Sequence, residues 1–274
     1  MTFNCNTEFI GKQHIWLEET DSTNSLLRRL LSDGVTIEHK TYGGMLIEGA
    51  PKEGAMIVAD SQNAGRGRSG HTWKSPAGTS IALSVLLKPD VNDNSIPIVT
   101  LIAALAVSET VKKVCNLDTK IKWPNDIIVG GRKICGILTE LDITDGRKSL
   151  ILGVGINVNQ QSFPDDISDI ATSLLIETGV EVDRALVVST FAEALEKYYK
   201  KFLITGNMSL LKNEYEKLLI NIGKEVKVLD PLENITGIAR GIDDNGELLV
   251  ETKEGVVRHV YAGEVSVRGI YGYV

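Results

Sequence analysis

Residues 65–70, GRGRSG, combine residue types that suit the binding of an anion. Glycine allows backbone N–H groups to approach a ligand closely, and each arginine offers a planar fork of donors that fits a carboxylate or a phosphate. The segment lies between two apolar runs, 56–59 and 81–87, which predict two strands. We therefore expect an anion-binding loop, although a mobile basic surface loop without a ligand has the same composition.

A second polar segment, residues 122–126 with the sequence KWPND, follows a short β-type run at residues 119–121. A lysine, a turn stiffened by proline and an Asn-Asp pair bring one cation and two polar side chains close together. Such a set suits a phosphate group, so this segment favours the ligand-binding interpretation of the arginine loop. The alternative for Lys122 is a solvated lysine at the end of a strand.

Five motifs, taken together, resemble those of the biotin protein ligases. They are TDSTN at 20–24, GRGRSGHTW at 65–73, KWPND at 122–126, KICGILTE at 133–140 and GVGINVN at 153–159. The motifs follow the order of that family, and with a fitting C-terminal segment the resemblance covers nearly the whole chain. It implies a ligase that uses ATP to activate biotin as biotinyl-adenylate. The ligase would then transfer biotin to a lysine of a biotin carboxyl carrier protein or domain of a biotin-dependent carboxylase.

The resemblance also implies which residues contact biotin. Ser22, Thr23 and Asn24 would touch the biotin ring from the start of a helix, where N–H groups and hydroxyls converge. Gln62 would pair with the ureido group, which presents both donors and an acceptor. The expected biotin-binding residues are Ser22, Thr23, Asn24, Gln62, Gly65, Arg66, Gly67, Arg68, Lys122, Gly136 and Leu138. Helix capping by residues 22–24 and turn stabilisation by Gln62 are the structural alternatives.

Activation of biotin requires two anions to meet, because its carboxylate attacks the α-phosphate of ATP. Positive groups must reduce that repulsion, so we expect Lys122 and Arg68 to be catalytic. The resemblance places Trp73 on the face of adenine and Asn157 at its edge, with simple core packing as the alternative for Trp73. The expected ATP-binding residues are Arg66, Arg68, His71, Trp73, Lys122, Asn125, Lys133 and Asn157. ATP chemistry also implies Mg²⁺, for which Asp126 is a candidate outer ligand.

Two departures from the family pattern are informative. His71 stands where the family commonly has an arginine, and a neutral imidazole binds phosphate less firmly. Only 19 residues precede the TDSTN motif, too few for a helix-turn-helix domain, so we expect no DNA binding. A homodimer is a candidate assembly that the sequence leaves open.

The pattern of apolar runs predicts an α+β protein. We expect a catalytic domain with a mixed or antiparallel sheet at residues 1–221 and a small SH3-like β-barrel at residues 222–274. One helix is expected to be capped by Asp21, Ser22 or Thr23 and to end at Gly34; others are expected at residues 98–114, 183–202 and 209–219, with a helical turn at 171–176. Expected strands of the first domain include 15–17 and 150–158, and a hairpin joins 127–129 to 134–141 across Gly130 and Gly131. Five short strands are expected in the second, at 226–229, 236–240, 248–251, 256–261 and 265–268.

Composition limits the classes of function. The 274 residues carry a net charge of −7, which argues against a protein that mainly binds nucleic acid without specificity. Cys5, Cys115 and Cys135 show no spacing typical of a metal site or a disulfide framework, so we expect reduced thiols in a cytoplasmic protein. No apolar run approaches the roughly 20 residues that span a bilayer, and no membrane association is expected.

Two other functions remain open at this stage. A lipoate or octanoate ligase or transferase would share the fold, but its narrow acyl tunnel does not require the GRGRSGHTW loop. A regulator that senses nucleotides without catalysis is the alternative from another class, and the acidic charge argues against a DNA-binding form of it.

Overall fold

The computed structural model describes residues 3–33, 50–74, 76–144, 147–229, 234–262 and 266–269. These residues form a seven-stranded sheet with the order β1-β2-β3-β7-β6-β5-β4 and a five-stranded sheet with the order β11-β10-β9-β8-β12. In the larger sheet β1 and β2 are parallel, whereas the other neighbouring strands are antiparallel. The α+β prediction with a mixed sheet is therefore confirmed.

The strands of the larger sheet are β1 (His14–Thr20), β2 (Met56–Gln62), β3 (Ser80–Leu87), β4 (Lys120–Lys122), β5 (Asp126–Val129), β6 (Arg132–Thr144) and β7 (Arg147–Asn157). The helices are α1 (Thr23–Asp33), α2 (Ile98–Cys115), α3 (Leu174–Thr178), α4 (Arg184–Thr205) and α5 (Lys212–Leu218), with 3₁₀ turns η1 (Arg68–Gly70) and η2 (Asp93–Ser95). The short helices begin about three residues later than predicted, at Leu174 instead of Ala171 and at Lys212 instead of Ser209. The glycines and short apolar runs between Gly34 and Met56 predict a strand, turns and a loop, and residues 34–49 of this segment lie outside the described residues.

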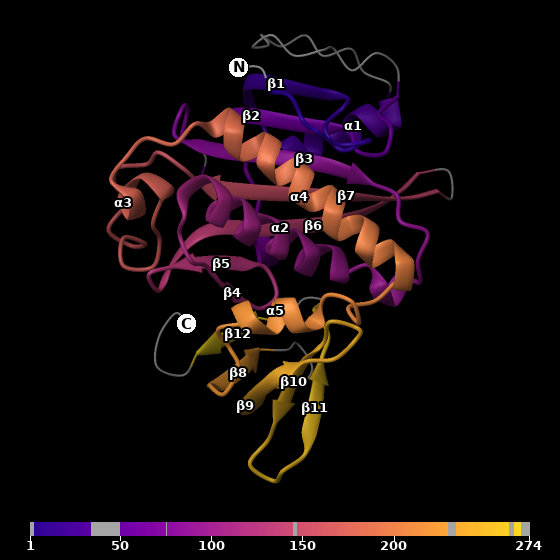
Figure 1. Ribbon diagram of the computed structural model, residues 1–274, viewed down its shortest axis with the longest axis vertical. Helices are drawn as coiled ribbons and strands as arrows, with labels where there is room; N and C mark the ends of the chain where they lie inside the picture. Colours follow the sequence, from indigo (N-terminus) through magenta and orange to yellow (C-terminus); the bar gives the residue numbers. More distant parts are fainter. Residues whose placement is uncertain are drawn as a thin grey trace.

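The larger sheet is covered unequally on its two faces. On one face α2 and α4 lie side by side across the strands, and α1 lies on the other (Figure 1). Alternate residues of β7 explain the division: Leu150, Leu152, Val154 and Ile156 belong to the core under α2 and α4, whereas Ile151 packs with Leu26, Leu27 and Leu30 of α1. A helix of 11 residues cannot cover seven strands, so part of the α1 face stays open.

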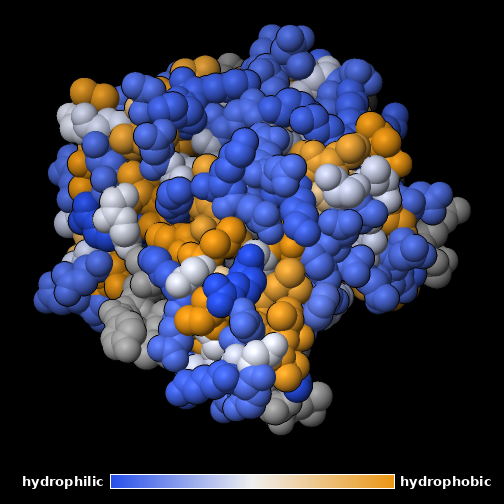
Figure 2. Space-filling model, turned by 60° about the horizontal axis from the view of Figure 1, so that its bottom comes forward, coloured by the Kyte–Doolittle hydropathy of each residue, from blue (hydrophilic) through white to orange (hydrophobic). Residues whose placement is uncertain are grey.

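The smaller sheet consists of β8 (Glu225–Leu229), β9 (Ile235–Ile242), β10 (Leu248–Glu251), β11 (Val257–Val260) and β12 (Ser266–Gly269). All its neighbouring strands are antiparallel, as expected for the second domain. Figure 2 brings this end of the molecule forward and shows apolar side chains in patches among polar ones. Val256, Val257 and Tyr261, in and beside the edge strand β11, are among the exposed apolar residues.

The two sheets are joined through the KWPND turn. Trp123 is buried, as predicted, but it does more than fill the core: its Nε1 donates to the carbonyl of Gly246, 3.0 Å away in the β9–β10 turn. Its backbone N–H donates to Asn221 Oδ1 at 2.9 Å, and Ile220 donates to the carbonyl of Ile121. The segment that carries Lys122 is therefore held from both sides, by the larger sheet and by the smaller one.

Candidate active site

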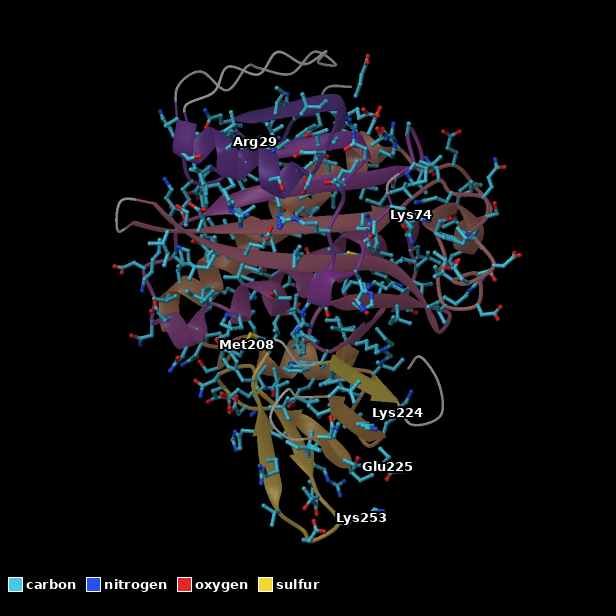
Figure 3. All side chains as sticks on the ribbon, turned by 180° about the vertical axis from the view of Figure 1, so that it is seen from behind. Arg29, Lys74, Met208, Lys224, Glu225 and Lys253 are labelled. Atoms are coloured by element: carbon cyan, nitrogen blue, oxygen red, sulfur yellow. The ribbon has the colours of Figure 1, made fainter. Side chains whose placement is uncertain are left out.

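A cavity of about 1030 Å³ opens on the α1 face of the larger sheet. Figure 3 shows this face, with Arg29 on α1 at one side of the sheet and Lys74, just past the arginine loop, at the other. Every residue predicted to bind biotin, ATP or metal lines the cavity except Gly65. Gly65 is buried beneath the loop, where a Cβ would lie 2.3 Å from the carbonyl oxygen of Trp73. The cavity has two ends of different chemistry.

The first, called here the helix end, is formed by the first turn of α1 and the side chain of Gln62. Gln62 Oε1 accepts from the backbone N–H of Thr23 at 2.8 Å and lies 3.2 Å from its hydroxyl. Ser84, fully buried on β3, contacts Thr23 Oγ1 at 2.7 Å and Asn24 Oδ1 at 2.5 Å. Ser22, Thr23 and Asn24, at the start of α1, are each less than 5% exposed. The helix end is therefore a largely buried hydrogen-bonding surface, and the residues at the start of α1 add no positive charge to it.

The floor of the cavity is formed largely by glycines, which have no side chain. Gly136 of β6 and Gly155 of β7 are direct partners in the ladder, as are Leu138 and Gly153. The Trp73 indole lies against this floor, since a Cβ on Gly155 would be 2.3 Å from Trp73 Cε2. Trp73 Nε1 is a buried donor with no hydrogen-bond partner among the residues that the structure describes. The glycines thus leave space for the Trp73 ring, whose Nε1 can donate a hydrogen bond.

The arginine loop crosses the cavity and is held at both sides. Its backbone closes through Gly67 N to His71 O at 2.7 Å and Trp73 N to Gly65 O at 2.9 Å. Arg66 reaches toward α1 and β6, where Nη2 lies 2.9 Å from Glu140 Oε2. Arg68 reaches the opposite way, and Nη1 donates to Asn125 Oδ1 at 3.0 Å. The two arginines therefore serve different ends of the cavity.

The second end, called here the turn end, carries positive charge. Lys122 ends β4 and is only 7% exposed, opposite Asp126 on β5. Lys133 Nζ lies 2.5 Å from Asp126 Oδ1 and 5.8 Å from the centre of the Trp73 ring. Burial lowers the pKa of Arg68, and the charge of Asp126 opposes that shift. Three cations and one carboxylate thus face the same region, which favours a ligand with several negative charges.

Asn157 and His71 sit differently from the other predicted residues. The Asn157 amide is buried and already used, because Nδ2 donates to Thr172 O at 3.0 Å and Oδ1 accepts from Gln160 Nε2 at 3.2 Å. His71 is exposed at the end of η1. Both line the cavity.

Asp126 is the predicted metal ligand, and in the structure its carboxylate forms an ion pair with Lys133. Among the described residues, one group of three His, Cys, Asp or Glu side chains comes close enough to share an ion: Asp243, Glu247 and His259. That group belongs to the smaller sheet, and none of its members lines the cavity. Asp126 would thus need ligand oxygens to complete a magnesium shell.

Several residues of the site were missed by the sequence analysis. Gly153 and Gly155 could have been found from their spacing of two, which places both on one face of a strand. Ser84 is the polar residue within the buried run of β3, and Glu140 follows Leu138 on the site face of β6. The loop around Phe163 and the side chain of Val267 also line the cavity, and no local pattern predicts either.

Comparison with known proteins agrees with this geometry. The family described as "Biotin/lipoate A/B protein ligase family" matches residues 35–159, and "Biotin protein ligase C terminal domain" matches residues 222–268. The chain is 37% identical over 267 residues to the bifunctional ligase/repressor BirA of Bacillus spizizenii, covering 96% of this chain and 77% of that protein. It is 35% identical over 223 residues to the biotin--[acetyl-CoA-carboxylase] ligase of Mycobacterium tuberculosis, covering 79% and 80%.

Among solved structures, the biotin protein ligase from Aquifex aeolicus in complex with biotin and ATP matches with a TM-score of 0.78 and 33% identity. The match covers 94% of this chain and 99% of that one. The lipoate alternative is not favoured, because the Mycobacterium tuberculosis relative and the Aquifex aeolicus structure are both biotin ligases. By fold, site and sequence, the chain belongs to the biotin protein ligases.

Proposed function

We propose that this chain joins biotin to a lysine of a biotin carboxyl carrier protein or domain, through biotinyl-adenylate. The observation that supports this most directly is one continuous cavity with a hydrogen-bonding helix end and a cationic turn end. A ureido ring needs acceptors for its N–H groups and a donor for its carbonyl oxygen, whereas a nucleoside triphosphate needs cations. The helix end offers hydrogen-bonding groups for biotin, and the turn end offers cations for the triphosphate.

In the first half-reaction, a carboxylate oxygen of biotin attacks the α-phosphorus of ATP and pyrophosphate leaves. Lys122, almost fully buried, reduces the repulsion between the two anions, and Arg68 holds the α-phosphate from the loop side. Lys133 neutralises charge beside the Trp73 ring. These assignments rest on the shared location of the three cations.

The nucleotide base is expected on the glycine floor beside Trp73, because an aromatic ring and an unpartnered buried N–H make a receptive surface there. Asn157 would have to exchange a contact with Gln160 or Thr172 to reach the base. His71 is proposed to contribute only a weak phosphate contact. Magnesium would supply charge neutralisation for pyrophosphate, held chiefly by phosphate oxygens with Asp126 as its protein ligand.

In the second half-reaction, the carrier's lysine amine attacks the carbonyl of the mixed anhydride, AMP leaves, and the amine loses a proton. The carrier partner is proposed from the relative that acts on acetyl-CoA carboxylase. A homodimer, the absence of DNA binding, a cytoplasmic location and the domain limits 1–221 and 222–274 stay predictions. Across the described residues, none of the helices is long and apolar enough to span a membrane.

Pyrophosphate exchange tests the proposal. Labelled pyrophosphate should enter ATP only when biotin is present, and the exchange should not be supported by lipoate. Biotinylation of a carrier domain, followed by mass spectrometry, then tests the second half-reaction. Exchange with lipoate but not with biotin would overturn the proposed substrate.

A further inference from the structure

Glu140 does not line the cavity but stands directly behind the helix end, on the site face of β6. Its side chain is 18% exposed. One carboxylate oxygen, Oε2, accepts from Asn24 Nδ2 at 2.7 Å and from Arg66 Nη2 at 2.9 Å, while Arg28 lies 3.5 Å from Oε1. A carboxylate flanked by two arginines can only accept hydrogen bonds, and this fixes which end of the Asn24 amide faces it.

The orientation of Asn24 decides where the proton of Ser84 goes. With Nδ2 toward Glu140, Oδ1 faces the Ser84 hydroxyl 2.5 Å away, so Ser84 must donate its single proton to Asn24. Asn24 is held closely in this place, since a Cβ on Gly153 would lie 2.5 Å from the same oxygen. The Ser84 oxygen is then left as an acceptor.

Thr23 completes the chain of hydrogen bonds. Its Oγ1 lies 2.7 Å from Ser84 Oγ, a distance at which two oxygens need a proton between them. Because the Ser84 proton is committed to Asn24, the Thr23 hydroxyl donates to Ser84 and not to Gln62 Oε1, the other acceptor within its reach at 3.2 Å. The lone pairs of Thr23 Oγ1 then remain for the cavity, which Thr23 lines.

We propose that Glu140 is a positioning residue that sets the direction of this chain, through Asn24 and Ser84, so that Thr23 presents an acceptor to a ligand N–H. The ligand class is a cyclic urea or a similar ring with N–H donors, and this part rests on the proposed function. Gln62 complements Thr23: its Oε1 accepts from the Thr23 backbone, which leaves its Nε2 as a donor for a carbonyl oxygen.

Glu140→Met removes the acceptor at a similar volume. Asn24 Nδ2 then keeps only the more distant acceptor, the carbonyl of Leu138 at 3.5 Å. The apparent KM for biotin in pyrophosphate exchange should rise by about 10- to 100-fold, the range expected when a buried donor loses its closer partner. The KM for ATP and kcat should stay within about threefold of wild type. Glu140→Gln should restore most of the biotin affinity, because its amide oxygen can accept from Asn24.

Asp142→Met is the matched control, two residues along the same strand. Asp142 contacts Arg28 at 3.2 Å, so this variant removes an ion pair on the same helix. It should leave the biotin KM unchanged. Arg66→Met tests the second partner of Glu140, but Arg66 itself lines the cavity, so the double variant decides. If Glu140→Met raises the biotin KM no further in the Arg66→Met background, the carboxylate acts through Arg66 and the proposal is wrong.

Ser84→Ala interrupts the chain of hydrogen bonds in its middle. It provides the test if Glu140→Met fails to fold. It should raise the biotin KM to a similar extent, and adding Glu140→Met should cost little more, because the chain is already broken. Full additivity, or a wild-type biotin KM in both single variants, would overturn the inference. If the wild-type chain does not bind biotin at all by calorimetry, the proposed function fails instead.

Discussion

The two ends of the cavity differ in the chemistry of their side chains. At the helix end, neutral side chains on α1, β2 and β3 satisfy one another, with Glu140 behind them and Arg66 of the loop paired to that carboxylate. At the turn end, Lys122, Arg68 and Lys133 face the cavity themselves. The first end recognises a pattern of donors and acceptors, whereas the second recognises charge.

This difference teaches how one cavity can hold two unlike substrates without confusing them. A pattern of hydrogen bonds on regular elements is rigid and loses much when a single group is displaced. Charge on turns and loops tolerates small movements, because Coulomb attraction changes slowly with distance. The substitutions below should therefore separate the two ends by which substrate they affect.

Lys122→Ala should have the largest effect. It removes a nearly buried cation from the turn end, and loss of one such stabilising group costs about 2.7 to 4 kcal/mol, or about 100- to 1000-fold in kcat. Pyrophosphate exchange should measure this loss, while biotin binding by calorimetry should weaken far less, because Lys122 is one of several expected biotin contacts. Turnover equal to that of the wild-type protein would remove Lys122 from the mechanism.

Gly153→Ala and Gly155→Ala test the comparison as a pair, because the two glycines lie two residues apart on the same face of β7. The first puts a Cβ 2.5 Å from the Asn24 amide and the second 2.3 Å from the Trp73 ring. Overpacking of about 1 to 3 kcal/mol should raise the KM for biotin in the first variant and for ATP in the second, each by about tenfold. Equal effects on both substrates from either variant would show that the two ends are not independent.

Arg68→Gly should form adenylate but retain it poorly. A charge-assisted contact contributes roughly 1.5 to 3 kcal/mol, enough to shorten the residence time about tenfold. Adenylate that escapes should label lysines of bystander proteins, which mass spectrometry of a mixture with carrier would detect. Arg66→Gly is the loop-matched comparison, because Arg66 reaches Glu140 at the other end and should not cause this leakage. Labelling restricted to the carrier in Arg68→Gly would contradict the assignment.

Asp21→Asn should have the smallest effect, on stability alone. Two hydrogen bonds from Arg29 and one from the Ser22 backbone hold the pKa of Asp21 below its ordinary value. The folded protein therefore gains stability above the unfolded pKa near 3.8 and loses it as pH falls through that range. Because the pair is exposed and screened, we expect a difference of about 0.5 to 1 kcal/mol at neutral pH, decreasing in acid. Urea unfolding at several pH values measures it, and a constant difference would exclude the ion pair as its source.

Much of this architecture could be predicted from sequence because the periodic signals are local. The helix from Asp183 and the hairpin across Gly130 and Gly131 depend on caps and turns a few residues long, and both were predicted. Every site residue predicted from the motifs except Gly65 lines the cavity, although the lining from residues 160–171 and from Val267 was not predicted. These signals survive because the residues that carry them belong to single elements.

What sequence could not predict depends on contacts between distant segments. Glu140 acts 116 positions from Asn24, and Ser84 joins α1 to the middle of the sheet. The ion pair of Asp126 with Lys133 spans the β5–β6 hairpin, and a sequence interpretation of Asp126 as a metal ligand has no way to include it. Side-chain direction and strand register decide such pairs, and neither is encoded locally.

The hydrogen bond from Trp123 to Gly246 has a consequence for the folding of the whole chain. It fastens the smaller sheet to the turn that carries Lys122, so neither can open without disturbing the other. Binding of substrate at the turn end should therefore lower the population of partly unfolded forms in which the smaller sheet has separated. Backbone amides of β9 and β10, far from any reacting atom, should then exchange more slowly with solvent when the cavity is filled.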